Sequence, residues 1–319
     1  MRYPIGLQSF DHLREEGYVY VDKTAMVYSL AHGSTVYFLG RPRRFGKSLL
    51  ISTFENYFLG KKELFKGLAI EKLETEWKTY PVFHIDFGTG SYANEDALNQ
   101  IFEFYLSGWE KKYQIEREPG VTDYNLRFKK VLEEAHRQTG LRAVVLVDEY
   151  DKPLLDVMDT GYMVEHLGEQ ITLEEKNRNM LRAFYSTFKG ADKHLQFVFL
   201  TGVTKFSQVS VFSDFNQPND ISMSPKYDTI CGITDEELEQ TFSQQIEELA
   251  AVYDYTGEKM RAVLKKRFDG YHFSKRMKGV YNPFSILNTF DKQDVQDYWF
   301  RTGTPTYLVR LLNHFDENL

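Results

Sequence analysis

Short apolar runs alternate with longer helical patterns along most of the chain. Four runs are almost continuously apolar and a fifth is shorter; they cover residues 35–39, 81–87, 143–147, 194–201 and 221–223. Such runs are typical of strands buried on both faces of a parallel sheet. Segments with apolar residues at helical spacing lie between them, at residues 48–70, 91–118, 122–139 and 173–190. The pattern predicts an α/β fold with a sheet between helices.

The pattern after residue 232 is mainly helical. Thr234 is followed three residues later by Glu237, which predicts an N-terminal capping box, and the helical pattern continues to about Phe268. We therefore divide the chain into residues 1–232, which carry the predicted sheet, and residues 233–319, a helical C-terminal region.

Composition narrows the class of protein further. Apolar residues make up 42% of the 319 positions and aromatic residues 15%, which is enough for one large or two smaller cores and argues against disorder. A net charge of −7 disfavours a generally basic nucleic-acid-binding protein. Cys231 is the one cysteine, so a reducing compartment fits. We see neither a signal peptide nor an apolar run approaching the ~20 residues that span a bilayer, and expect a cytoplasmic protein without membrane partners.

A loop with two glycines joins the first predicted strand to the next helix. Gly46 has no Cβ where the chain would pass close to a phosphate, Lys47 would reach the β- and γ-phosphates of ATP, and the Ser48 hydroxyl would bind Mg²⁺. The usual motif has glycine where this chain has Arg41. A chance Gly-Lys-Ser at a helix start is the alternative. The predicted ATP-binding residues are Gly40, Arg41, Pro42, Arg43, Arg44, Phe45, Gly46, Lys47, Ser48 and Leu49.

Two acidic residues end the apolar run at 143–147. Carboxylates at the end of a buried strand are costly unless they have partners or a function, and this end of the strands is where open α/β sheets bind ligands. Asp148 would hold Mg²⁺, directly or through water, and Glu149 would position or activate an attacking water. Alternatively, both acids simply begin the following loop. The order of phosphate loop, intervening strand and Asp-Glu strand favours the first interpretation.

Other polar residues near strand ends are weaker candidates. Thr201 would sense the γ-phosphate from a strand between the other two, or would merely cap a turn. Asp86 either faces the nucleotide or is a solvent-facing or turn-capping carboxylate, and His84 is interpreted as structural. The strand-like run at 18–24, with Asp22 or Thr24 capping the next helix, either packs near the base of the nucleotide or forms a surface strand.

Six separated motifs, in this order, resemble those of the bacterial AAA-ATPase-like family. They are Tyr20-Val-Asp-Lys-Thr24, Arg41-Pro-Arg-Arg-Phe-Gly-Lys-Ser48, Asp148-Glu-Tyr-Asp-Lys-Pro153, Leu200-Thr-Gly-Val-Thr-Lys205, Tyr281-Asn-Pro-Phe284 and Gly303-Thr-Pro305. The resemblance implies a P-loop NTPase of the additional-strand class, with strand order 5-1-4-3-2. It implies that the loop and the Asp-Glu pair are its Walker A and Walker B motifs, and that Arg41 is the family's own variant. Family members often carry a C-terminal nuclease domain of the PD-(D/E)xK type; this chain ends about where that domain would begin.

The sequence favours an ATP-hydrolysing enzyme, with a non-catalytic nucleotide switch or an interaction module linked to a nuclease as alternatives. An arginine finger would come from Arg43 or Arg44, or from Arg178 or Arg182 of a neighbouring copy in a homo-oligomer. The acid-x-Lys pattern at Glu174–Lys176 is interpreted as a helix start. The basic residues at 259–278, with aromatic residues among them, favour a solvated surface over a nucleic-acid contact.

Overall fold

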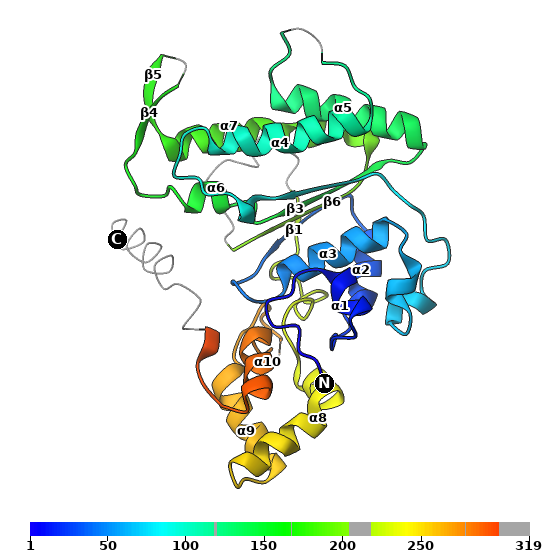
Figure 1. Ribbon diagram of the computed structural model, residues 1–319, viewed down its shortest axis with the longest axis vertical. Helices are drawn as coiled ribbons and strands as arrows, with labels where there is room; N and C mark the ends of the chain where they lie inside the picture. The colour runs from blue at the N-terminus through cyan, green and yellow to red at the C-terminus, as the bar shows by residue number, and fades with distance from the viewer. Residues whose placement is uncertain (118–119, 167, 204–217, 278, 300–319) are drawn as a thin grey trace.

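The core of the computed structural model, which describes residues 1–117, 120–166, 168–203, 218–277 and 279–299, is a five-stranded sheet (Figure 1). Every neighbouring pair of strands in it is parallel. The sheet's strands lie in the order β2-β3-β6-β1-β7. Their bounds are β1 Val36–Gly40, β2 Val82–Asp86, β3 Ala143–Asp148, β6 Leu195–Gly202 and β7 Asn219–Asp220.

The labels of this order differ from the predicted 5-1-4-3-2 because two strands of the chain lie outside the sheet. The hairpin of β4 (Met163–His166) and β5 (Glu169–Thr172) takes two numbers between β3 and β6. Counted within the five-stranded sheet alone and read from β7, the strands are the fifth, first, fourth, third and second in the chain. The first and third sheet strands, which lead into the phosphate loop and the Asp-Glu pair, are separated by β6.

Helices cover both faces of the sheet (Figure 1). One layer holds α1 (Phe10–Glu15), α2 (Thr24–Ala31) and α3 (Lys47–Phe58), and the other holds α4 (Ala97–Lys112), α5 (Tyr124–Thr139) and α7 (Leu173–Gly190). Each face of the sheet has its own hydrophobic core, and alternate residues of the central strands belong to one core or the other. Val145 and Val147 pack with the α4–α5–α7 layer, and Val144 and Leu146 pack with the α1–α3 layer. This explains why β3 is apolar at consecutive positions.

The C-terminal region has its own apolar core. It contains α8 (Asp235–Val252), α9 (Gly257–Phe268) and α10 (Pro283–Lys292). Thr234 and Glu237 form the predicted capping box. Side chains of the N-terminal segment, Tyr3, Val19 and Val21, pack against this third core, so the two ends of the described chain meet here (Figure 1).

Several local predictions are wrong in their details. Residues 18–24 form no strand, and the loop predicted after Met158 contains the β4–β5 hairpin. The helix predicted over residues 48–70 ends at Phe58, because Gly60 adopts a left-handed φ of 69° that stops it, and 3₁₀ turns follow at Lys62–Phe65 and Ala69–Lys72. The helix predicted up to Phe268 is divided between α8 and α9.

Shorter elements complete the described chain: α6 (Lys152–Leu155) and 3₁₀ turns at Phe87–Thr89 and Asp192–His194. Within the described residues, no helix is both long and apolar enough to cross a membrane. The motif residues Thr204, Lys205 and 303–305, and Lys278 of the basic segment, lie outside the described residues.

Candidate functional site

The loop between β1 and α3 has the backbone of an anion cradle. Gly46, directly before α3, has a left-handed φ of 89°, a conformation that favours glycine. A Cβ there would meet nothing within 4 Å, so glycine is required by the backbone conformation rather than by crowding. The first N–H groups of a helix lack intrahelical acceptors. The first N–H groups of α3 therefore border the loop and are suited to binding phosphate oxygens.

Lys47 is held inside this loop. Its side chain is 6% exposed, and its ammonium donates to the carbonyl oxygens of Arg41 at 3.0 Å and Pro42 at 3.1 Å. Burial lowers the pKa of Lys47, while the carboxylates of Asp148, Asp151 and Glu149 raise it. The ammonium therefore lies between loop carbonyls and carboxylates, at the place where a phosphate would find a cation.

The carboxyl ends of three adjacent strands bring Gly40, Thr201 and Asp148 together. Leu39 pairs with Thr201 across β1 and β6, and Val147 pairs with Leu200 across β6 and β3. Asp148 is 4% exposed. Its Oδ1 accepts hydrogen bonds from the Thr201 hydroxyl and, at 3.0 Å, from the Glu149 N–H. Thr201 is fully buried and thus orients Asp148, a contact that the sequence pattern did not predict.

Glu149 leaves the strand in a different direction from Asp148. Its φ is 51°, a left-handed conformation uncommon for a residue with a side chain. Burial, and then the neighbouring Asp148 charge, raise the pKa of the Glu149 carboxyl. The carboxylate lies against Gly88, where a Cβ would meet Glu149 Oε2 at 2.9 Å. Asp86 accepts from the Gly88 N–H at 2.7 Å and thereby caps the turn at Phe87–Thr89, which is the turn-capping role that the sequence offered as an alternative. Gly88 lies between the Asp86 and Glu149 carboxylates.

Two features of the site were missed from the sequence. Asp151 is 1% exposed, and its Oδ2 accepts from the Val203 N–H at 2.8 Å, which fixes the turn after β6. Gly202 ends β6 against Tyr150, and a Cβ at Gly202 would lie 2.5 Å from a Tyr150 ring carbon. Glycine at the end of a buried strand is a general signal of such close approach, although it does not name the residue that approaches.

The remaining loop residues have different surroundings. The Arg41 carbonyl accepts from Lys47, but the Arg41 guanidinium binds the segment after β7 and donates to the Ser222 carbonyl at 2.7 Å. Phe45 is buried beside Tyr271, with ring centroids 4.7 Å apart. Ser48, in the first turn of α3, is partly exposed. Pro42, Arg43 and Leu49 are also partly exposed, and Arg44 is exposed.

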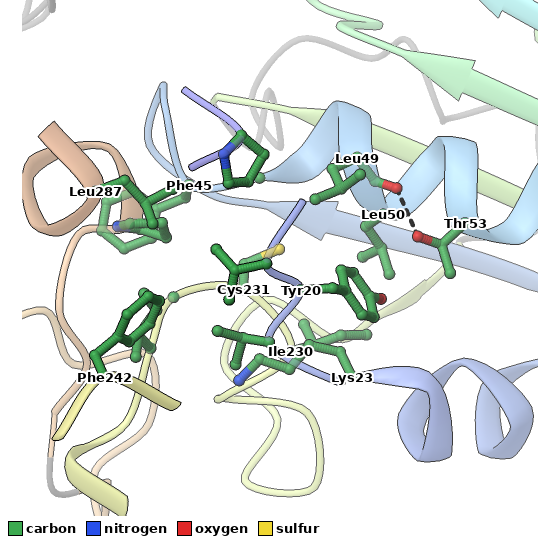
Figure 2. Close-up of a pocket in the computed structure, with 17 residues that line it drawn as sticks. Tyr20, Lys23, Phe45, Leu49, Leu50, Thr53, Ile230, Cys231, Phe242 and Leu287 are labelled. Atoms are coloured by element: carbon green, nitrogen blue, oxygen red, sulfur yellow. Dashed lines mark hydrogen bonds between the residues drawn. The ribbon is translucent and has the colours of Figure 1, made fainter. Parts of the chain in front are cut away.

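An apolar pocket of about 100 Å³ lies beside the loop (Figure 2). Three parts of the chain line it: the N-terminal segment with Tyr20, the start of α3 with Leu49, and the C-terminal region with Phe242 and Leu287. Gly46 is part of the lining, so the pocket is continuous with the phosphate loop. No aspartate or glutamate is among the residues that line it. The pocket is therefore suited to a flat apolar group next to a phosphate chain.

Lys23 closes one side of this pocket. Its side chain is 8% exposed and its Nζ donates to both carboxylate oxygens of Glu237, at 2.5 and 2.6 Å. Asp22 accepts from the Thr24 N–H at 2.8 Å and from the Ala69 N–H at 2.7 Å. The N-cap residue of α2 is Lys23, which makes no side-chain cap hydrogen bond, and Asp22 one position earlier binds the first N–H of the helix. The motif around Lys23 links the N-terminal segment to α8.

The donors available for a metal are hard oxygens. Within the part of the chain that the structure describes, no three His, Cys, Asp or Glu side chains are grouped so as to hold a metal ion by themselves. The Ser48 hydroxyl and the Asp148 carboxylate are the type of ligand that Mg²⁺ takes when substrate phosphates and waters complete its shell. The candidate arginine fingers Arg178 and Arg182 lie on α7, where Arg178 pairs with Glu174.

Together these features define an α/β protein with a mostly parallel five-stranded sheet between helices, a glycine-containing loop before α3 and a helical C-terminal region. The chain belongs to the predicted AAA-ATPase family, whose model matches residues 4–212. It is also similar to the "Uncharacterized protein in vnfD 5′region" of Azotobacter chroococcum mcd 1, with 37% identity over 313 residues. That alignment covers 97% of this chain and 55% of the relative. The chain therefore spans about half the length of this curated relative.

Proposed function

We propose that this protein binds ATP with Mg²⁺ and hydrolyses it, as a P-loop NTPase of the additional-strand class. The observation that carries the proposal is the position of Lys47. Its ammonium is enclosed by the loop carbonyls of Arg41 and Pro42 and is influenced by Asp148 and Glu149. Family membership and the order of the sheet's strands support the class. The physiological role stays open.

Each residue of the site has a distinct role in the proposed reaction. Lys47 and the N–H groups at the start of α3 bind the β- and γ-phosphates. Ser48 and Asp148 hold the metal, and Thr201 keeps the Asp148 carboxylate in place. Glu149 accepts a proton from the water that attacks the γ-phosphate. When bound, Mg²⁺ neutralises the charge that develops on the phosphoryl oxygens.

We assign the pocket beside the loop to the adenine ring. Its lining is largely apolar, and Gly46 places it next to the phosphate cradle. The lining contains no carboxylate that could pair with the N1–H and N2–H donors of guanine. The pocket lies between the parts we propose as an ATPase domain, residues 1–232, and a C-terminal region, residues 233–319.

The alternative is a nucleotide-dependent switch that does not turn over, or an interaction module that serves a nuclease. One observation favours the switch: the Trp299 indole, near the end of the described chain, donates at 2.9 Å to the carbonyl of Arg43 in the phosphate loop. Nucleotide binding at the loop would then change the position of the C-terminal region. A homo-oligomer with an arginine finger in trans and a cytoplasmic location are further parts of the main proposal.

The change Lys47→Ala tests nucleotide binding directly. It removes the cation aimed at the phosphates, and charge-assisted contacts are worth roughly 1.5–3 kcal/mol, so we expect ATP affinity to fall about tenfold to hundredfold. Isothermal titration calorimetry with ATP and Mg²⁺ measures this. Lys61→Ala is the matched control, because Lys61 pairs with Asp11 at 3.5 Å on the surface. Equal affinities for Lys47→Ala and the wild type would refute the phosphate-loop assignment.

A further inference from the structure

Arg41 is a cation buried at the start of the phosphate loop. Its side chain is 1% exposed, and its acceptors are main-chain carbonyls rather than carboxylates. Nη1 donates to Gly40 at 2.9 Å and Ser222 at 2.7 Å, and Nη2 to Tyr227 at 3.2 Å and Asp228 at 3.4 Å. The guanidinium therefore holds the end of β1 against the segment that follows β7.

The flat face of the Arg41 guanidinium packs on an aromatic ring of the C-terminal region. Its carbon lies 4.0 Å from the centre of the Phe273 ring, a cation–π distance. A charge buried without a carboxylate partner is costly, and burial lowers the Arg41 pKa. Arg41 Nε has no hydrogen-bond partner within the described chain. Stability alone is therefore a weak reason for an arginine at this position.

Other residues of the loop also contact the C-terminal region. Phe45 packs its ring edge-to-face with Tyr271, at 4.7 Å, and with Phe273, at 5.5 Å. The Arg44 guanidinium lies 5.0 Å from the Phe284 ring centre. Trp299 donates to the Arg43 carbonyl. Four loop positions are thus joined to aromatic residues between 271 and 299.

We infer that Arg41 is a positioning residue that joins the phosphate loop to the C-terminal region, so that a displacement of one displaces the other. It acts through the loop backbone, because its guanidinium binds main-chain carbonyls of Gly40 and of the segment after β7. Its own carbonyl accepts from the Lys47 ammonium. Arginine suits this task because its planar fork binds carbonyls on two segments while its face packs on a ring.

The inference extends the proposed function, but part of its test is independent of ATP. Hydrogen–deuterium exchange on the nucleotide-free protein compares the wild type with Arg41→Lys and Phe273→Leu. Lysine keeps the charge but loses the fork. We expect exchange to quicken about tenfold in the loop, at residues 220–228 and at residues 271–284 in either variant. Arg142→Lys, at an exposed arginine that donates to Gln196, is the control and should change none of these segments.

The second measurement uses ATP as the probe. Coupling energies between sites commonly correspond to roughly five- to 150-fold in affinity, and we expect Arg41→Lys to weaken ATP binding within that range. The affinity of the double variant Arg41→Lys/Phe273→Leu should fall less than the product of the two single effects, because both changes break the same contact.

Tryptophan emission reports on the contact between Trp299 and the loop carbonyl of Arg43. This emission should change on ATP addition in the wild type and much less in Trp299→Phe.

The outcomes separate the two proposals. Faster exchange in all three segments with weakened ATP binding supports the inference. Faster exchange confined to the residues around each substitution, with residues 271–284 unchanged in Arg41→Lys and the loop unchanged in Phe273→Leu, overturns it. If the wild type binds no ATP but exchange spreads through all three segments, the proposed function fails while the link between loop and C-terminal region stands.

Discussion

At the scale of single residues, the adjacent carboxylates of Asp148 and Glu149 lie in different surroundings. Asp148 ends β3 and accepts from the Thr201 hydroxyl, so its carboxylate is held in one orientation. Glu149 turns through a left-handed conformation and lies against Gly88, and its pKa is raised by burial. A group fixed by hydrogen bonds suits a metal ligand, and a carboxyl with a raised pKa suits a base. The geometry thus favours separate roles.

Replacing each acid by its amide should separate binding from turnover. Asp148→Asn should weaken Mg²⁺-dependent ATP binding as well as hydrolysis, because it removes the metal's carboxylate. Glu149→Gln keeps the size of the side chain but loses the base, so ATP affinity should stay near the wild-type value while turnover falls roughly a hundredfold to ten-thousandfold. Both quantities are measured at one Mg²⁺ concentration, by titration and by steady-state phosphate release.

Glu76→Gln, which makes the same change at an exposed glutamate paired with Lys78, is the control for this comparison. If the wild type releases phosphate no faster than Glu149→Gln, the enzyme assignment is wrong and the switch takes its place. If both amide variants lose binding and stability together, the acids are structural.

The raised pKa of Glu149 also predicts how stability depends on pH. The folded state then binds a proton more tightly than the unfolded state, so Glu149 makes stability fall as pH rises from its usual value of 4.5 through the folded-state pKa. In the nucleotide-free protein, Glu149→Gln should therefore raise the melting temperature at pH 7 relative to wild type. The gain should disappear near pH 4. A lower melting temperature for Glu149→Gln at pH 7 would contradict the proposed burial.

At the scale of elements, regular strands and helices were readable from the sequence, and contacts between them were not. The runs at 143–147 and 194–201 became β3 and β6 because apolar residues at consecutive positions must be covered on both faces. The β4–β5 hairpin was missed because its residues are mostly polar or exposed, with Val164 the buried member. The pattern of apolar residues predicts a strand poorly where most of the strand's side chains are polar or exposed to solvent.

The placement of the candidate residues was predictable where neighbours in the chain determine it. Gly46 and Lys47 lie at the start of α3 and Asp148 ends β3, as expected, because loop, strand end and helix start follow one another in the chain. The Thr201–Asp148 contact and the direction of the Arg41 side chain depend on which strands and segments become neighbours. Sequence spacing does not carry that information, so these contacts required the structure.

The capping box of α8 offers a test at the same scale. Thr234 accepts from the Glu237 N–H at 3.1 Å, and Glu237 also binds the buried ammonium of Lys23. Loss of an N-cap costs about 1 kcal/mol. We expect Thr234→Ala to lower the free energy of unfolding by that amount or more, because Glu237 is displaced as well. Denaturant unfolding measures it.

Thr256→Ala is the matched comparison for Thr234→Ala. Thr256 caps α9 by accepting from the Lys259 N–H at 3.2 Å, and it has no glutamate partner of this kind. A cost for Thr256→Ala equal to or above that of Thr234→Ala would mean that the link between Glu237 and Lys23 adds nothing to the cap.

At the scale of the whole molecule, three basic residues of the segment at 259–278 are paired with acids nearby. Arg261 pairs with Glu239 and Glu247, Lys265 with Asp235 and Asp269, and Arg267 with Asp297. Lys259 lies over the Tyr255 ring, 3.5 Å from its centre. These pairs reduce the positive potential between residues 261 and 267, and the net charge of −7 for the chain acts in the same direction.

We accordingly expect little or no binding of nucleic acid by this surface. Each phosphate contact releases counterions, so real binding would weaken steeply as salt rises, and it should be sought first in low salt. The experiment is a gel shift with double- and single-stranded DNA and with RNA, using wild type and a triple charge reversal of Lys265, Lys266 and Arg267 to glutamate. Triple reversal of Lys61, Lys62 and Lys66 to glutamate, at exposed positions remote in sequence from the segment, controls for net charge. A salt-sensitive shift in the wild type that the triple variant loses and the control keeps would show that the segment binds nucleic acid. A shift lost equally in both variants would instead reflect the overall charge of the protein.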